Sequence, residues 1–167
     1  PYIIYPHGSL DPYLRKKSRI RKVFFHKLFM DRMLNAAAAV HYTTEEEKKL
    51  AHEQLGYTSP TMVLAPGIDM SEFEDLPEKG SFQKLYPQLA GHPIILFLSR
   101  VNFKKGLDLL AQAFGQVAKT NPEVRLVIVG PEDPGFGDQV RAWLQENQVL
   151  DKTLFTGMLR GKDKLAA

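Results

Sequence analysis

The 167-residue sequence contains no cysteine, which excludes disulfide bonds and thiolate metal sites and fits a reducing compartment. No apolar run approaches the roughly 18 residues of a membrane-spanning helix, and no signal peptide opens the chain. The net charge of +3 is too small to indicate nucleic-acid binding. Neither a G-x-G-x-x-G dinucleotide fingerprint nor a P-loop occurs. With 44% hydrophobic and 25% charged residues, the composition is that of an ordinary globular protein.

The most informative stretch that is present reads as strand, loop and helix. Five consecutive apolar residues, 94–98, predict a strand buried on both faces, as in a parallel sheet. A helix is predicted over 107–119, and Asn121 and Pro122 end it. Its apolar face contains Leu107, Leu110, Ala111, Phe114, Val117 and Ala118.

Two cations flank the loop of this unit. Arg100 follows the end of the strand, and Lys105 precedes the start of the helix. A helix N-terminus offers free N–H groups and partial positive charge. The pattern therefore predicts a site for a dianion such as a diphosphate, and the alternative is a plain strand–helix unit with two solvated cations.

The rest of the chain also alternates between strands and helices. Strands are predicted over 2–5, 40–43, 124–130 and 153–157, with a further strand and turn over 60–69. Helices are predicted over 45–55 and 81–89, with Thr44 as N-cap and Gly56 as terminator of the first. Short connections between such elements predict a parallel α/β sheet in each half, with 71–92 as the linker region.

A histidine after the first strand and a run of three glutamates are the residues of the first half that we consider as possible sites. His7 and Gly8 follow the first strand, and ligand sites of open α/β sheets lie at such strand ends; the alternative is a surface histidine at a turn. The glutamates at 45–47 occupy consecutive helix positions, so they point in different directions and cannot converge on one metal ion. We interpret them as helix capping and solvated charge, and predict no metal site.

A basic block spans Arg15–Lys22. It contains six basic residues within eight positions, and aromatic residues follow it. One interpretation is a patch that docks on an anionic membrane surface, although amphipathic helices are common without such a role. The alternative is an ordinary helix with one face in the core. Nucleic acid is not expected as a partner, because the neighbouring aromatic residues have the helical spacing of a core face.

The strand–loop–helix stretch resembles the donor-binding signature of retaining glycosyltransferases of family 4, also called group 1. The resemblance is carried by Ser99–Arg100, Lys105–Leu110 and Ala113–Phe114, in which five features agree across sixteen positions. His7–Gly8 matches a His–Gly element of that family. Phe155–Gly157 resembles its phenylalanine-x-glycine strand, and the segment Pro66–Asp69 resembles its proline–glycine–aspartate segment.

The resemblance implies an α/β protein of GT-B type, with parts of two Rossmann-like parallel β/α domains. Residues 1–70 would end the acceptor-side domain, and 93–167 would begin the nucleotide-sugar donor domain. His7 would be catalytic, and Arg100 and Lys105 would bind the donor diphosphate. Met158 and Leu159 would line the nucleotide-base pocket. No metal or other cofactor is expected, and no tight Asp-x-Asp element is present.

The implied function is transfer of a sugar from a nucleotide diphosphate sugar to a glycan or lipid-linked acceptor, in cell-surface polysaccharide or glycolipid synthesis. The expected location is the cytoplasm, at the inner face of the membrane. The family's glutamate pair has no match after Gly157, so we expect a fragment of a longer enzyme that is inactive alone. The alternative function is a non-catalytic nucleotide- or phosphate-binding module. The sugar, base, acceptor and oligomeric state are not indicated.

Overall fold

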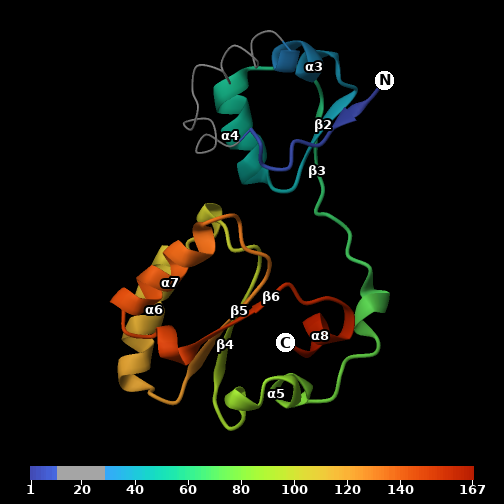
Figure 1. The fold of residues 1–167 in the computed structure, drawn as a ribbon. Helices are drawn as coiled ribbons and strands as arrows, with labels where there is room; N and C mark the ends of the chain where they lie inside the picture. The colour runs from blue at the N-terminus through green and yellow to red at the C-terminus, as the bar shows by residue number, and fades with distance from the viewer. Residues whose placement is uncertain (11–28) are drawn as a thin grey trace. The chain divides into compact units, whose positions relative to one another are not determined.

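The computed structural model describes residues 1–10 and 29–167 of the chain. The chain divides into two compact units, Pro1–Asp69 and Met70–Ala167 (Figure 1). Within the described ranges, no helix is both long and apolar enough to cross a lipid bilayer.

The first unit contains a parallel sheet of order β1-β2-β3, formed by Ile3–Ile4, Ala39–Tyr42 and Thr61–Val63. Its named α-helices are α3 (Asp31–Ala36) and α4 (Glu45–Leu55). The core consists of Leu10, Leu34, Ala37, Val40, Tyr42, Ala51 and Tyr57. The first strand is shorter and less buried than the sequence predicts, since Ile3 is 58% exposed.

Helix α4 begins and ends where the local signals place it. The Thr44 hydroxyl accepts a hydrogen bond from the Glu47 N–H at 3.1 Å, which satisfies one free donor of the first turn. Gly56 ends the helix in the left-handed conformation, at φ +58°. Both predictions are confirmed.

The second unit contains a parallel sheet of order β4-β5-β6, formed by Ile94–Leu98, Arg125–Val129 and Thr153–Gly157. Its α-helices are α5 (Ser81–Leu85), α6 (Leu107–Thr120), α7 (Phe136–Glu146) and α8 (Gly161–Ala166). Four short 3-10 helices complete it: η2 (Met70–Phe73), η3 (Pro87–Leu89), η4 (Phe103–Lys105) and η5 (Leu150–Lys152).

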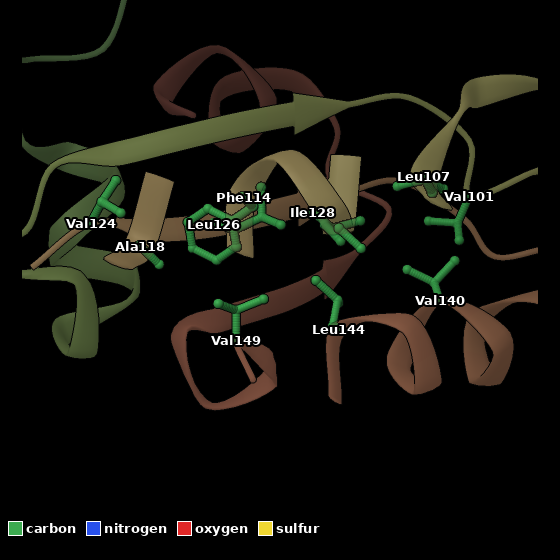
Figure 2. Packing of buried hydrophobic residues seen from close by; sticks show 11 residues of the cluster. Val101, Leu107, Phe114, Ala118, Val124, Leu126, Ile128, Val140, Leu144 and Val149 are labelled. Carbon is green, nitrogen blue, oxygen red and sulfur yellow. The ribbon is translucent and has the colours of Figure 1, made fainter. Parts of the chain in front are cut away.

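Helices α6 and α7 cover one face of this sheet, and α5 and α8 lie on the other (Figure 1). The α6–α7 side buries Leu107, Phe114 and Leu144 against Leu126 and Ile128 of β5 (Figure 2). On the opposite side a smaller cluster contains Phe82, Leu89, Val127 and Val129. Strand β5 is therefore buried on both faces.

Strand β4 is not buried on both faces, which corrects the prediction. Ile95 and Phe97 pack against the α6–α7 cluster, but Leu96 is 39% and Leu98 is 50% exposed. Among the described residues β4 is the edge strand of its sheet, and the smaller cluster covers only Ile94. Val117, expected on the buried face of α6, is likewise 38% exposed.

The stretch 71–92, expected as a linker region, contributes to the core of the second unit. Phe82 is 3% and Leu89 is 1% exposed, and both pack against Val127 and Val129. This packing gives α5 and η3 a structural role in the unit. The domain limits of the whole protein stay a prediction.

Candidate functional site

The carboxyl ends of β4, β5 and β6 are held together beyond the strands themselves. The Ser99 N–H donates to the Val129 carbonyl at 3.0 Å, and the Gly130 N–H donates to the Gly157 carbonyl at 2.8 Å. Gly130 has φ +148°, and a Cβ there would lie 2.0 Å from the Ser99 carbonyl oxygen. Only glycine permits this approach of the two loops.

Val101 anchors the loop after β4 in the core. It is fully buried, its N–H donates to the Pro131 carbonyl at 2.9 Å, and its carbonyl accepts from the Asp133 N–H at 3.1 Å. The buried side chain and the two backbone bonds fix the position of the residues on either side, Arg100 and Asn102.

Asn102 organises the next turn. Its side-chain carbonyl accepts from the Lys104 N–H at 3.0 Å, and its backbone carbonyl accepts from the Lys105 N–H at 3.0 Å. Its side-chain amide donates to the Asp133 carboxylate. These bonds hold η4, the short helix that contains Lys104 and Lys105.

The loop encloses a hollow of about 380 Å³ lined by Ser99, Arg100, Asn102, Lys104 and Lys105. Within the part of the chain that the structure describes, neither Arg100 nor Lys105 has a side-chain hydrogen bond or an ion pair. Lys104 contacts the Phe103 ring, with its Nζ 5.9 Å from the centroid. Three cations thus line one hollow, and residues 1–10 and 29–167 place no carboxylate in its lining, an arrangement that attracts an anion.

The predicted pair of Arg100 and Lys105 is therefore brought together in one hollow. Helix α6 begins directly after the loop that contains Lys105. Its N-cap is Gly106, at φ +64°, so no side chain caps the helix. The first N–H groups of such a helix have no intrahelical acceptor, and the helix dipole favours an anion near them. The geometry can bind a dianion through a planar guanidinium and two point charges.

His7 lies in the first unit, after β1. It is exposed and has φ +49°, an uncommon conformation for a residue other than glycine. The Tyr5 ring lies between two imidazoles, with centroids 3.7 Å from His7 and 4.2 Å from His41. This places His7 on an aromatic support at the carboxyl end of the sheet.

Glu47 fixes the turn that contains His7. One carboxylate oxygen accepts from the Gly8 N–H at 2.9 Å, and the other accepts from the N–H and hydroxyl of Thr43 at 2.9 and 2.8 Å. Burial acts to raise the pKa of Glu47, but these hydrogen bonds and the nearby His41 outweigh it, so the pKa is lowered. The interpretation of the glutamates as capping residues fits the bonds of Glu47 to Thr43 at the start of the helix, but the interpretation as solvated charge is wrong for Glu47, which is partly buried.

Met158 and Leu159 follow β6 and do not line the hollow. Met158 is 55% exposed, and Leu159 packs against the smaller core cluster of the second unit. Their role in base binding stays a prediction. The block Arg15–Lys22 lies outside the described residues, and within them no cluster of three or more His, Asp or Glu side chains is placed to hold a metal ion.

Sequence reasoning missed Asn102, Lys104 and Asp133. Asn102 had a recognisable signal, because asparagine before a short helical turn is a common cap. Lys104 is adjacent to the predicted Lys105, but its place in the hollow depends on the η4 turn. Asp133 had no local signal, since it meets Asn102 from 31 positions further along the chain.

A family model described as glycosyl transferases group 1 matches residues 83–167. The alpha-monoglucosyldiacylglycerol synthase of Streptococcus pneumoniae is 29% identical over 102 residues, which cover 58% of this chain and 22% of the relative. A GDP-mannose-dependent alpha-(1-6)-phosphatidylinositol monomannoside mannosyltransferase of Mycolicibacterium smegmatis is 26% identical over 99 residues, 59% of this chain and 26% of that relative. The chain thus spans about a quarter of these relatives.

Among solved structures, Anabaena HepE in complex with UDP-glucose matches 99% of this chain and 44% of its own, with a TM-score of 0.75 and 20% identity. At this identity the likeness establishes the fold alone. The two units have the α/β architecture of parts of the Rossmann-like domains in GT-B structures, which confirms the predicted fold class.

Proposed function

The chain belongs to the group 1 glycosyl transferases, and from that membership we propose that it is part of an enzyme that uses a nucleotide diphosphate sugar. The enzyme transfers the sugar to a glycan or lipid-linked acceptor, in polysaccharide or glycolipid synthesis. The observation that carries this proposal is the hollow of Arg100, Lys104 and Lys105, whose lining among the described residues contains no carboxylate. Its charge and place suit the donor diphosphate.

The proposed catalysis is electrostatic. As the bond between the sugar and the diphosphate breaks, negative charge grows on the leaving diphosphate. Arg100 and Lys105 stabilise that charge more in the transition state than in the ground state, which lowers the barrier. Because the cations and the α6 N-terminus supply positive charge, we propose that no metal ion is required. Retention of stereochemistry rests on the family resemblance.

The other predicted site residues keep their proposed roles. His7 contacts the reacting groups as the catalytic residue of the first unit, because a neutral imidazole can both donate and accept a hydrogen bond. Met158 and Leu159 line the base pocket. The exposure of Met158 supports this role, because a ligand can reach the residue.

A lipid-linked acceptor is supported by the names of both curated relatives, which refer to a diacylglycerol and a phosphatidylinositol product or substrate. We propose that Arg15–Lys22 docks the enzyme on anionic lipid at the cytoplasmic face of the membrane. Docking would bring the first unit to a lipid acceptor.

The test is sugar transfer by the full-length protein with a panel of UDP- and GDP-sugars, monitored by release of the nucleoside diphosphate and by mass spectrometry of the acceptor. Transfer from one donor, with release of the matching diphosphate, is expected. Tight donor binding without release or transfer would instead support the alternative of a non-catalytic binding module. The family membership favours the enzyme over that alternative.

A further inference from the structure

The loops after β4 and β5 are joined by one side-chain pair, Asn102 and Asp133. The amide of Asn102 donates to the Asp133 carboxylate, and both side chains are partly buried. The backbone beside this pair is already fixed, since Val101 exchanges hydrogen bonds with Pro131 and Asp133. Because the neighbouring backbone is already held, loss of the hydrogen bond between Asn102 and Asp133 should disturb the η4 turn and leave the rest of the loop in place.

Asn102 uses its side-chain carbonyl for the turn and its amide for Asp133. The carbonyl accepts from the Lys104 N–H at 3.0 Å, so the rotation of the amide group decides whether that bond is aligned. Without Asp133 the amide has no fixed acceptor, and the side chain gains rotational freedom that competes with the cap. The bond to Asp133 thus orders the backbone of Lys104 and Lys105.

Asp133 is also an acid beside a hollow lined by three cations. Within the described residues its carboxylate has no ion pair with Arg100, Lys104 or Lys105, and it accepts from the neutral amide of Asn102 instead. Because its partner is an uncharged amide, the Asp133 carboxylate is held in place while the three cations stay available to an anionic ligand.

From this geometry we propose that Asn102 and Asp133 are positioning residues for the donor diphosphate, a role that rests on the proposed function. Their hydrogen bond sets the η4 turn so that Lys104 and Lys105 meet the diphosphate together with Arg100. Neither residue needs to touch the donor for this effect.

The proposal reverses the expectation of simple electrostatics. Removing the negative charge of Asp133 should by itself strengthen anion binding in the hollow. If the carboxylate positions the turn, Asp133→Ala should instead weaken binding of UDP or GDP about tenfold. Asp133→Asn removes the same charge but keeps an oxygen that accepts from Asn102, so it should bind at least as tightly as wild type.

A swap of the two residues supplies the second test. Asn102→Asp keeps an oxygen for the Lys104 N–H but sets two carboxylates against each other, so donor binding should fall. In the double variant Asn102→Asp with Asp133→Asn, the new amide can donate to the new carboxylate. Donor binding should recover partly, although one negative charge now lies closer to the hollow.

The measurements are made on the full-length protein. Calorimetry gives the dissociation constants of UDP and GDP, and steady-state kinetics separates donor KM from acceptor KM. Hydrogen exchange of the Lys104 and Lys105 amides is measured without ligand, and thermal melts control for folding. Asp133→Ala should raise donor KM and speed exchange at both amides, while acceptor KM stays unchanged. Asp133→Asn should keep donor KM and exchange at their wild-type values.

Equal binding and equal exchange in Asp133→Ala and Asp133→Asn would overturn the proposal. So would stronger binding in Asp133→Ala, because the carboxylate would then act through its charge alone. If wild type binds neither diphosphate, the proposed function fails, and the exchange rates alone decide whether the pair orders the turn.

Discussion

Replacing Glu47 by glutamine should loosen the turn that contains His7. The Glu47 carboxylate accepts from Gly8 at one oxygen and from the N–H and hydroxyl of Thr43 at the other. A glutamine offers only one carbonyl oxygen. Whichever way it turns, its NH₂ group faces the backbone N–H of Gly8 or of Thr43, and one donor loses its acceptor.

The magnitude follows from these contacts. An orphaned donor costs roughly 1–3 kcal/mol when buried, and Glu47 is only partly buried, so water offsets some of the loss. We expect Glu47→Gln to lower the free energy of unfolding by about 2 kcal/mol. At roughly 2–4 °C per kcal/mol for a domain of 150–250 residues, the melting temperature should fall by about 4–8 °C.

The stability lost in Glu47→Gln should depend on pH, and it should be larger at neutral pH than at acid pH. Because the pKa of Glu47 is lowered in the folded protein, its stabilisation is present above the ordinary carboxyl pKa of about 4.3. It is lost as the pH falls through the lower, folded value. The difference in melting temperature between wild type and Glu47→Gln should be full at pH 7 and shrink below about pH 4.

Thermal melts of the full-length protein between pH 3 and pH 8 measure this difference. Glu46→Gln is the matched control, since it removes an exposed carboxylate from the same first turn of α4 and should change the melting temperature little. Equal melting temperatures for the two variants at pH 7, or a Glu47 difference that does not change with pH, would refute the reasoning.

Three further predictions concern the second unit and the basic block. Gly130→Ala should lower the melting temperature and weaken nucleoside diphosphate binding, because its Cβ would lie 2.0 Å from the Ser99 carbonyl; unchanged calorimetry and melts would contradict this. Glu132→Gln should destabilise by only about 0.5–1 kcal/mol at pH 7, because its pair with Arg141 at 2.8 Å is partly exposed. The hydrogen bonds from Arg141 lower the pKa of Glu132, so this loss should disappear in melts at acid pH. Alanine at the basic positions of Arg15–Lys22 should reduce co-sedimentation with anionic vesicles at low salt, whereas equal pelleting with neutral vesicles would exclude the electrostatic attraction.

Elements set by neighbours in sequence were predictable. The limits of α4 follow from Thr44 and Gly56, and the structure places its ends there. The pairing of Arg100 and Lys105 was also visible, because a strand end and a helix start five positions apart must lie close in space. Each of these predictions depends on residues that are close together in the sequence.

Features that depend on distant segments were not predictable. Five apolar residues in a row indicate a strand covered on both sides, yet Leu98 is half exposed in the part of the chain that the structure describes, where β4 is an edge strand. Glu47 differs from its two neighbours by local bonds to Thr43 and by the bond from Gly8, and the Gly8 bond depends on a segment 39 positions away. Asp133 likewise meets Asn102 only because the loops after β4 and β5 lie side by side.

The most direct test of the central claim is steady-state donor kinetics of Arg100→Ala and Lys105→Ala in the full-length protein, with thermal melts as the control for folding. Loss of one charge-assisted contact to the diphosphate should cost roughly 2–4 kcal/mol in the transition state, about a thirty- to thousandfold fall in kcat/KM for the donor. Acceptor KM should change less and the melts should not change, because neither side chain belongs to the core. Near-native donor kinetics in both variants, with unchanged melts, would contradict the diphosphate site and leave two surface cations.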